Sequence, residues 1–124
     1  MASVLVVEDD PASMTLTVFL LKKGGHHVLQ AGDAETGLSL ARAAQPDLIL
    51  MDIELPGMDG FSALKLLRQE DSTKQIKVVA LTSLAMKGDR ERILAAGFDA
   101  YIGKPIRYQT FLPELDQVLG PDGG

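Results

Sequence analysis

Short apolar runs alternate along the chain with longer segments in which apolar residues recur at helical spacing. Five runs are predicted to be strands, at residues 3–8, 27–31, 47–53, 77–82 and 99–103. Five segments are predicted to be helices, at residues 11–23, 34–45, 61–69, 86–96 and 107–119. The pattern therefore predicts five strand–helix units in succession.

Residues with known preferences for helix ends separate these units. Three aspartates stand where N-caps are expected, namely Asp10, Asp33 and Asp59. Pro11 suits the first helical position because that position needs no N–H donor. The pair Gly24–Gly25 and Gly97 are predicted to stop the first and fourth helices.

The run at residues 47–53 is the most continuously apolar, which is typical of a central strand covered on both faces. Helical connections between short strands imply parallel pairing with right-handed crossovers. We therefore expect an α/β fold of the (βα)5 type, a doubly wound five-stranded parallel sheet. In the strand order 2-1-3-4-5, the first and third strands would be neighbours.

Composition narrows the class of protein. The 124 residues are 46% hydrophobic, which suits a single domain over residues 1–124 with a core at about 3–119 and a frayed tail at 120–124. The net charge of -5 without a basic cluster argues against nucleic-acid binding. The chain has no cysteine, and no apolar run approaches the roughly 18 to 20 residues of a membrane span. We expect a cytoplasmic protein.

Polar residues follow four of the predicted strands and are chemically matched. They are Glu8 and Asp9, Asp52, Thr82, and Lys104. Ligands of doubly wound sheets bind outside the carboxyl ends of the strands, where the strand order reverses. In the order 2-1-3-4-5, Glu8, Asp9 and Asp52 would meet at that point.

Three clustered carboxylates require a cation or a proton, because two like charges about 4 Å apart repel by roughly 4 kcal/mol at an effective dielectric constant near 20. Mg²⁺ prefers oxygen ligands and keeps several waters, which leaves room for a phosphoryl oxygen. A hydroxyl and an ammonium beside the carboxylates predict a Mg²⁺-assisted phosphoryl acceptor site.

Four motifs occur in order: VVEDD at 6–10, LILMDIELPGMDG at 48–60, ALTS at 80–83 and AYIGKP at 100–105. With them the chain, from Val4 to about Leu119, resembles the receiver domain of two-component response regulators, in the CheY-like superfamily with its flavodoxin-like fold. The resemblance implies that Asp52 is the phosphoacceptor.

The resemblance also implies the roles of the surrounding residues. Asp9 and Asp52 would hold Mg²⁺, with the Glu54 carbonyl as a further ligand and Glu8 contacting the ion directly or through water. Lys104 and Thr82 would bind the phosphoryl group. These roles suit phosphoryl transfer, which depends on positioning and on neutralising the phosphoryl oxygens.

A conformational switch is implied as well. The phosphoryl group would draw Thr82 inward and let Tyr101 turn in, remodelling the face formed by helix 86–96, strand 99–103 and helix 107–119. A cis peptide bond is expected at Lys104–Pro105. We expect binding partners to recognise this face.

Three positions vary within such domains. Side chains at Glu54 and Leu84 flank the path of the water that attacks the acyl phosphate, and we hypothesise that Leu84 impedes this water and prolongs the phosphorylated state. Gly103 stands where receiver domains usually carry a side chain, so the Lys104 loop is expected to be looser.

The segment AMKGDRE at 85–91 is similar to the start of the fourth helix in single-domain receivers and in receivers attached to hybrid kinases, and few residues follow the last helix. We therefore expect a stand-alone receiver without an output domain, and not a conventional turnover enzyme. Its partners would be a sensor histidine kinase or histidine phosphotransfer protein and a downstream protein target. It would act as a monomer or a phosphorylation-linked dimer.

Two other functional classes stay open. One is a metal-dependent phosphatase with an aspartyl nucleophile, which the acid-x-acid spacing of Asp52 and Glu54 suggests, although the chain has no segment for a substrate-covering cap. The other is a receiver-like interaction module that no longer accepts phosphate, although every phosphorylation position is filled.

Overall fold

A computed structural model of the chain describes residues 2–83 and 87–120. The prediction for Leu84, the start of the 85–91 segment and most of the expected tail lie outside the described residues. Among the helices that are described, none combines the length and the apolar composition needed to cross a membrane.

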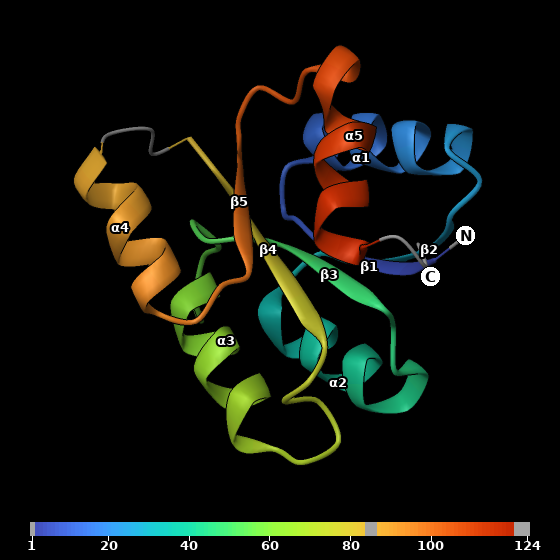
Figure 1. The fold of residues 1–124 in the computed structure, drawn as a ribbon. Helices are drawn as coiled ribbons and strands as arrows, with labels where there is room; N and C mark the ends of the chain where they lie inside the picture. Colours follow the sequence, from blue (N-terminus) through green and yellow to red (C-terminus); the bar gives the residue numbers. More distant parts are fainter. Residues whose placement is uncertain (1, 84–86, 121–124) are drawn as a thin grey trace.

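A five-stranded parallel sheet forms the centre of the fold (Figure 1). Its strands are β1 (Ser3–Val7), β2 (His27–Ala31), β3 (Leu48–Asp52), β4 (Lys77–Thr82) and β5 (Ala100–Gly103). They pair in the order β2-β1-β3-β4-β5, with every neighbouring pair parallel. The predicted strand order and the central place of β3 are confirmed.

Helices cover both faces of this sheet. They are α1 (Pro11–Lys23), α2 (Ala34–Ala44), α3 (Gly60–Gln69), α4 (Lys87–Ala95) and α5 (Tyr108–Leu119). Figure 1 shows α1 and α5 together on one face, whereas α2, α3 and α4 lie on the other. The predicted doubly wound fold is therefore confirmed.

The core consists of two apolar layers that share the strands. In β3, Leu48 and Leu50 pack against α1 and α5, whereas Ile49 and Met51 pack on the side of α2 and α3. This follows from the alternation of side chains along a strand. All five residues of β3 are buried because both faces of the sheet are covered. Asp52, the last residue of β3, falls on the same face as Leu48 and Leu50.

The predicted caps explain where three of the helices begin. Asp10, Asp33 and Asp59 each accept a hydrogen bond from a backbone N–H in the first helical turn, at 2.9, 2.7 and 2.9 Å. Asp10 in particular fixes the start of α1 directly after the acidic pair Glu8–Asp9. The chain therefore leaves β1 and enters α1 within three residues.

Candidate functional site

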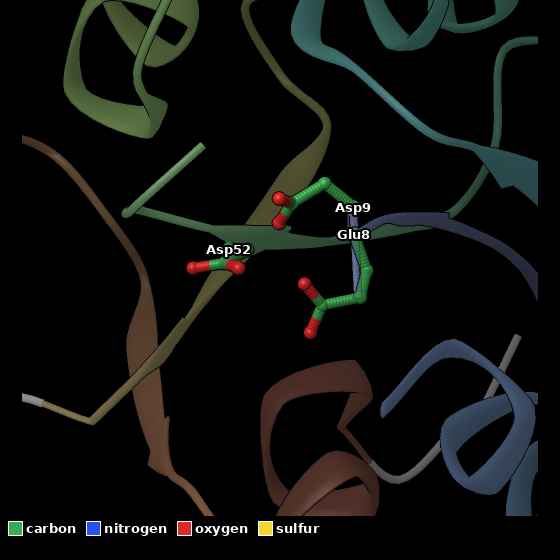
Figure 2. A group of neighbouring side chains, drawn as sticks. All are labelled: Glu8, Asp9 and Asp52. Atoms are coloured by element: carbon green, nitrogen blue, oxygen red, sulfur yellow. The ribbon is translucent and has the colours of Figure 1, made fainter. Parts of the chain in front are cut away.

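The acidic residues of the sequence meet at the carboxyl edge of the sheet. Val7 of β1 pairs with Met51 of β3, so Glu8 and Asp52 follow on neighbouring strands. Each of Glu8, Asp9 and Asp52 offers a carboxylate oxygen, and these oxygens lie within 4.8 Å of one another. Figure 2 shows the three carboxylates directed toward a common space. The predicted meeting of these residues is thus observed.

Lys104 enters this cluster from the end of β5. Its Nζ lies 2.6 Å from Glu8 Oε1 and 3.0 Å from Asp52 Oδ2. Its backbone N–H donates to the Thr82 carbonyl at 2.8 Å, which fixes the loop against β4. The Lys104–Pro105 peptide bond is cis, as the resemblance implied. One ammonium therefore contacts two of the three acids.

Burial makes these charges strongly dependent on one another. The Glu8 side chain is fully buried, and that of Asp52 is 4% exposed. Burial and a hydrogen bond with Asp52 raise the pKa of Glu8 to about 7, although Lys104 opposes the shift.

Asp52 and Lys104 are both held in their charged forms. Burial alone would raise the pKa of Asp52, but its hydrogen bond with Glu8 and the bonds that it accepts from the Glu54 N–H and Lys104 lower it. Burial likewise disfavours the Lys104 ammonium, but its bonds to Glu8 and Asp52 prevail and raise its pKa. Asp52 is therefore an ionised, nearly buried carboxylate, as a nucleophile requires.

The donor set fits a hard divalent cation. Three carboxylates and one ammonium leave an excess of two negative charges when all four groups are ionised. Among the described residues, Glu8 Oε1 is the buried side-chain oxygen without an aligned hydrogen-bond donor, despite its contact with Lys104. Mg²⁺ accepts such oxygen ligands and would neutralise the excess.

The loop after β3 closes tightly over the end of that strand. The Glu54 N–H donates to Asp52 Oδ1 at 2.8 Å, and the Gly60 N–H donates to the Ile53 carbonyl at 3.2 Å. A Cβ on Gly60 would lie only 2.6 Å from the Ile53 Cα, so a larger residue would push α3 away from the strand end. Gly60 thereby keeps the loop that orients Asp52 compact.

Thr82 and Tyr101 belong to the neighbouring strands β4 and β5. Thr82 ends β4 and is buried, and it pairs with Gly103 of β5. Tyr101 is half-buried, and the Arg90 guanidinium lies 5.9 Å from the centre of its ring. A Cβ on Gly103 would meet no atom within 4 Å, so this glycine leaves open space beside Lys104. Its effect on the looseness of the loop stays a prediction.

Sequence reasoning missed Ser83. Its hydroxyl donates to Glu54 Oε1 at 2.6 Å, and its backbone N–H donates to the same oxygen at 3.3 Å. The contact joins the loop after β3 to the loop after β4 across 29 positions of sequence. No local signal marks such a pairing, because it depends on the two strands being neighbours.

Several known proteins are similar to this chain over most of its length. The polar-differentiation response regulator DivK of Brucella anthropi is 42% identical to this chain over 118 residues, which cover 95% of the chain and 96% of DivK. The chemotaxis response regulator CheY4 of Vibrio cholerae superposes with a TM-score of 0.89 at 29% identity, covering 95% of this chain and 98% of CheY4.

A third similar protein is the receiver domain of a sensor histidine kinase from Pseudomonas aeruginosa. It superposes with a TM-score of 0.88 at 33% identity and covers 96% of this chain and 98% of its own, and its structure has a magnesium ion coordinated in the active site cleft. Residues 4–116 of this chain match the family model of the response regulator receiver domain. The chain therefore belongs to the response regulator receiver domain family.

Proposed function

We propose that this protein accepts a phosphoryl group on Asp52 and passes the signal to another protein. The observation that carries the proposal is the ionised Asp52 carboxylate, nearly buried beside Lys104 in a cluster with excess negative charge. Such a carboxylate is poised as a nucleophile and lies where a cation and an ammonium can neutralise phosphoryl oxygens. The donor would be a phosphohistidine of a sensor kinase or phosphotransfer protein.

The transfer is a single in-line displacement. A carboxylate oxygen of Asp52 forms a bond to phosphorus as the bond from phosphorus to the histidine nitrogen breaks, and the imidazole leaves with the electron pair. Lys104 already lies 3.0 Å from Asp52 Oδ2 and would stabilise the charge on the phosphoryl oxygens. The Thr82 hydroxyl would supply a further hydrogen bond.

Mg²⁺ is part of this proposal. Asp9 and Asp52 would hold it with their carboxylates, the Glu54 carbonyl would be a further ligand, and Glu8 would contact it directly or through water. When bound, the ion supplies positive charge that offsets the phosphoryl oxygens. The buried Glu8 oxygen without an aligned donor supports this assignment.

The output would be a change of surface. The acyl phosphate would carry about -1.5 to -2 charge in place of the single charge of the Asp52 carboxylate and would bring new acceptor oxygens, which would draw the Thr82 hydroxyl toward it and let the half-buried Tyr101 turn inward. Because Tyr101 contacts Arg90 of α4, its movement would alter the face formed by α4, β5 and α5. A downstream protein would recognise this face, either on a monomer or on a phosphorylation-linked dimer.

Intact-protein mass spectrometry after incubation with acetyl phosphate and Mg²⁺ tests the proposal. We expect one phosphate adduct in the wild type and none in D52N. D59N is the matched control, because Asn caps a helix as well as Asp does and the same charge is removed nearby. An adduct that persists in D52N would contradict the assignment. Turnover of many phosphomonoesters without an adduct would favour a phosphatase instead.

A further inference from the structure

Glu54 and Ser83 connect two loops at the carboxyl edge of the sheet. Glu54 follows the acceptor strand β3, and Ser83 follows Thr82 at the end of β4. Both donors of Ser83, the hydroxyl and the backbone N–H, converge on the single oxygen Oε1. The hydroxyl bond is the stronger of the two, because it is 2.6 Å long against 3.3 Å to the same oxygen.

A second potential partner for Glu54 lies close by. A cavity of about 350 Å³ is lined by Ile53, Glu54, Asp59, Phe61 and Arg92. The Arg92 guanidinium stacks over the Phe61 ring at 5.0 Å from its centre. Within the described part of the chain, no ion pair joins Glu54 to Arg92. Ser83 therefore holds the carboxylate although a cation borders the same cavity.

We propose that Ser83 is a positioning residue that holds the Glu54 carboxylate at the mouth of the acceptor site, where its charge slows the entry of anionic phosphoryl donors. The proposal rests on the proposed function of Asp52. It concerns a residue that neither the sequence motifs nor the family assignment connects with Glu54.

The physical effect is electrostatic. The Glu54 backbone N–H bonds to Asp52 Oδ1, so the Glu54 side chain is attached directly beside the acceptor carboxylate. Its charge adds to that of Glu8, Asp9 and Asp52 and repels a small anionic donor. Without the Ser83 hydroxyl, the carboxylate is free to turn toward Arg92, and an ion pair there would offset its charge. The mouth of the site would then be less negative.

The experiment measures the rate at which acetyl phosphate forms the Asp52 adduct in the wild type, E54Q, S83A and the double variant S83A/E54Q. E54Q removes the charge but keeps an oxygen that accepts from Ser83, and we expect a rate increase of about three- to fivefold. S83A keeps the weaker backbone bond, so we expect an increase of about twofold. The double variant should match E54Q, because the position of an uncharged side chain has no electrostatic effect.

Three controls separate positioning from simple structural damage. S83T retains the hydroxyl and should restore the wild-type rate. S39A and D116N remove a hydroxyl and a charge from exposed positions of α2 and α5, and both should leave the rate unchanged. The increase in the rate of adduct formation caused by S83A should become smaller as ionic strength rises from about 0.01 to 1 M, since salt screens exposed charges.

Two results would overturn the inference alone. One is an S83A rate equal to that of the wild type while adducts form normally on Asp52. The other is an S83A effect that multiplies with that of E54Q, because Ser83 would then act independently of Glu54. The absence of any adduct in the wild type would instead overturn the proposed function, and the inference would fall with it.

Discussion

The two edges of the sheet hold their charged side chains in opposite ways. At the amino edge, Arg68 of α3 donates to the carbonyls of Lys74, Ile76 and Gly97 and forms an ion pair of 3.0 Å with Asp99. Asp99 also accepts from the Val78 N–H at 2.8 Å. This network joins α3 to the starts of β4 and β5, and its cation and carboxylate balance.

At the carboxyl edge the balance is absent. Among the described residues, the Lys104 ammonium contacts Glu8 and Asp52, while Asp9 adds a third carboxylate and one oxygen of Glu8 has no aligned donor. A satisfied network contributes to stability, whereas an under-neutralised cluster is costly unless a ligand completes it. The difference teaches that charge excess, rather than the number of charged residues, distinguishes the site from a structural network.

The largest expected effect comes from K104M, which removes the ammonium that contacts Glu8 and Asp52 and keeps a similar apolar stem. We expect the rate of adduct formation from acetyl phosphate to fall by at least about 100-fold, because a preorganised charge beside the phosphoryl oxygens is lost. Timed mass spectrometry measures the rate, and K65M at an exposed position of α3 is the control. A rate within about threefold of the wild type would show that the ammonium is dispensable.

The corresponding change at the amino edge is R68M. It removes the guanidinium that donates to three carbonyls and to Asp99, and we expect the free energy of unfolding to fall by about 2 kcal/mol in a urea titration. The folded protein should still form the Asp52 adduct at the wild-type rate. If R68M instead slows phosphorylation without loss of stability, the amino-edge network does not serve stability alone, and the contrast between the two edges is wrong.

Mg²⁺ should stabilise the folded protein, and the gain should depend on the carboxylates at the carboxyl edge and not on those at the amino edge. Ligand linkage predicts that Mg²⁺ at about ten times its Kd raises the free energy of unfolding by about 1.4 kcal/mol. D9N should lose most of this gain, because Asp9 would supply a carboxylate ligand. D99N serves as the control at the amino edge and should keep its full response. An equal response in D9N and the wild type would remove Asp9 from the metal site.

The smallest effect is a pH dependence of stability without metal. The pKa of Glu8 is raised to about 7 in the folded protein from 4.5, so the unfolded chain releases this proton first as pH rises. Stability should therefore fall between about pH 4.5 and 7 through this group and not change further above that range. In EDTA, E8Q should show a smaller decline in its urea midpoint over this interval. An unchanged decline would assign the pH dependence to other groups.

Much of the fold could be predicted because its signals are local. The caps at Asp10, Asp33 and Asp59 were predicted from residue type alone, since a side chain that bonds to the next helical turn needs no distant partner. Predicted strand and helix bounds differ from the observed ones by at most one residue at either end. Gln45, which ends α2 in the left-handed region at φ 50°, was not predicted, because glycine usually fills that role.

Contacts between distant loops were harder to predict from the sequence. Ser83 and Glu54 stand 29 positions apart, and neither belongs to a pattern that pairs them. The network of Arg68 and Asp99 was missed for the same reason, since it spans 31 positions. Hydrogen bonds of this kind depend on how loops fold beyond the strand ends, where strand periodicity no longer constrains them.

The sequence by itself determined that acids, a hydroxyl and an ammonium follow particular strands, because apolar periodicity defines the strands and their ends. Only the tertiary structure decided which of these groups touch. The register of β1 against β3 brings Glu8 to Asp52, and the pairing of β5 with β4 brings Lys104 to both. The physical reason is that the pairing of distant strands depends on the burial of the whole sheet. The residue type at each strand end, in contrast, is a property of the local sequence.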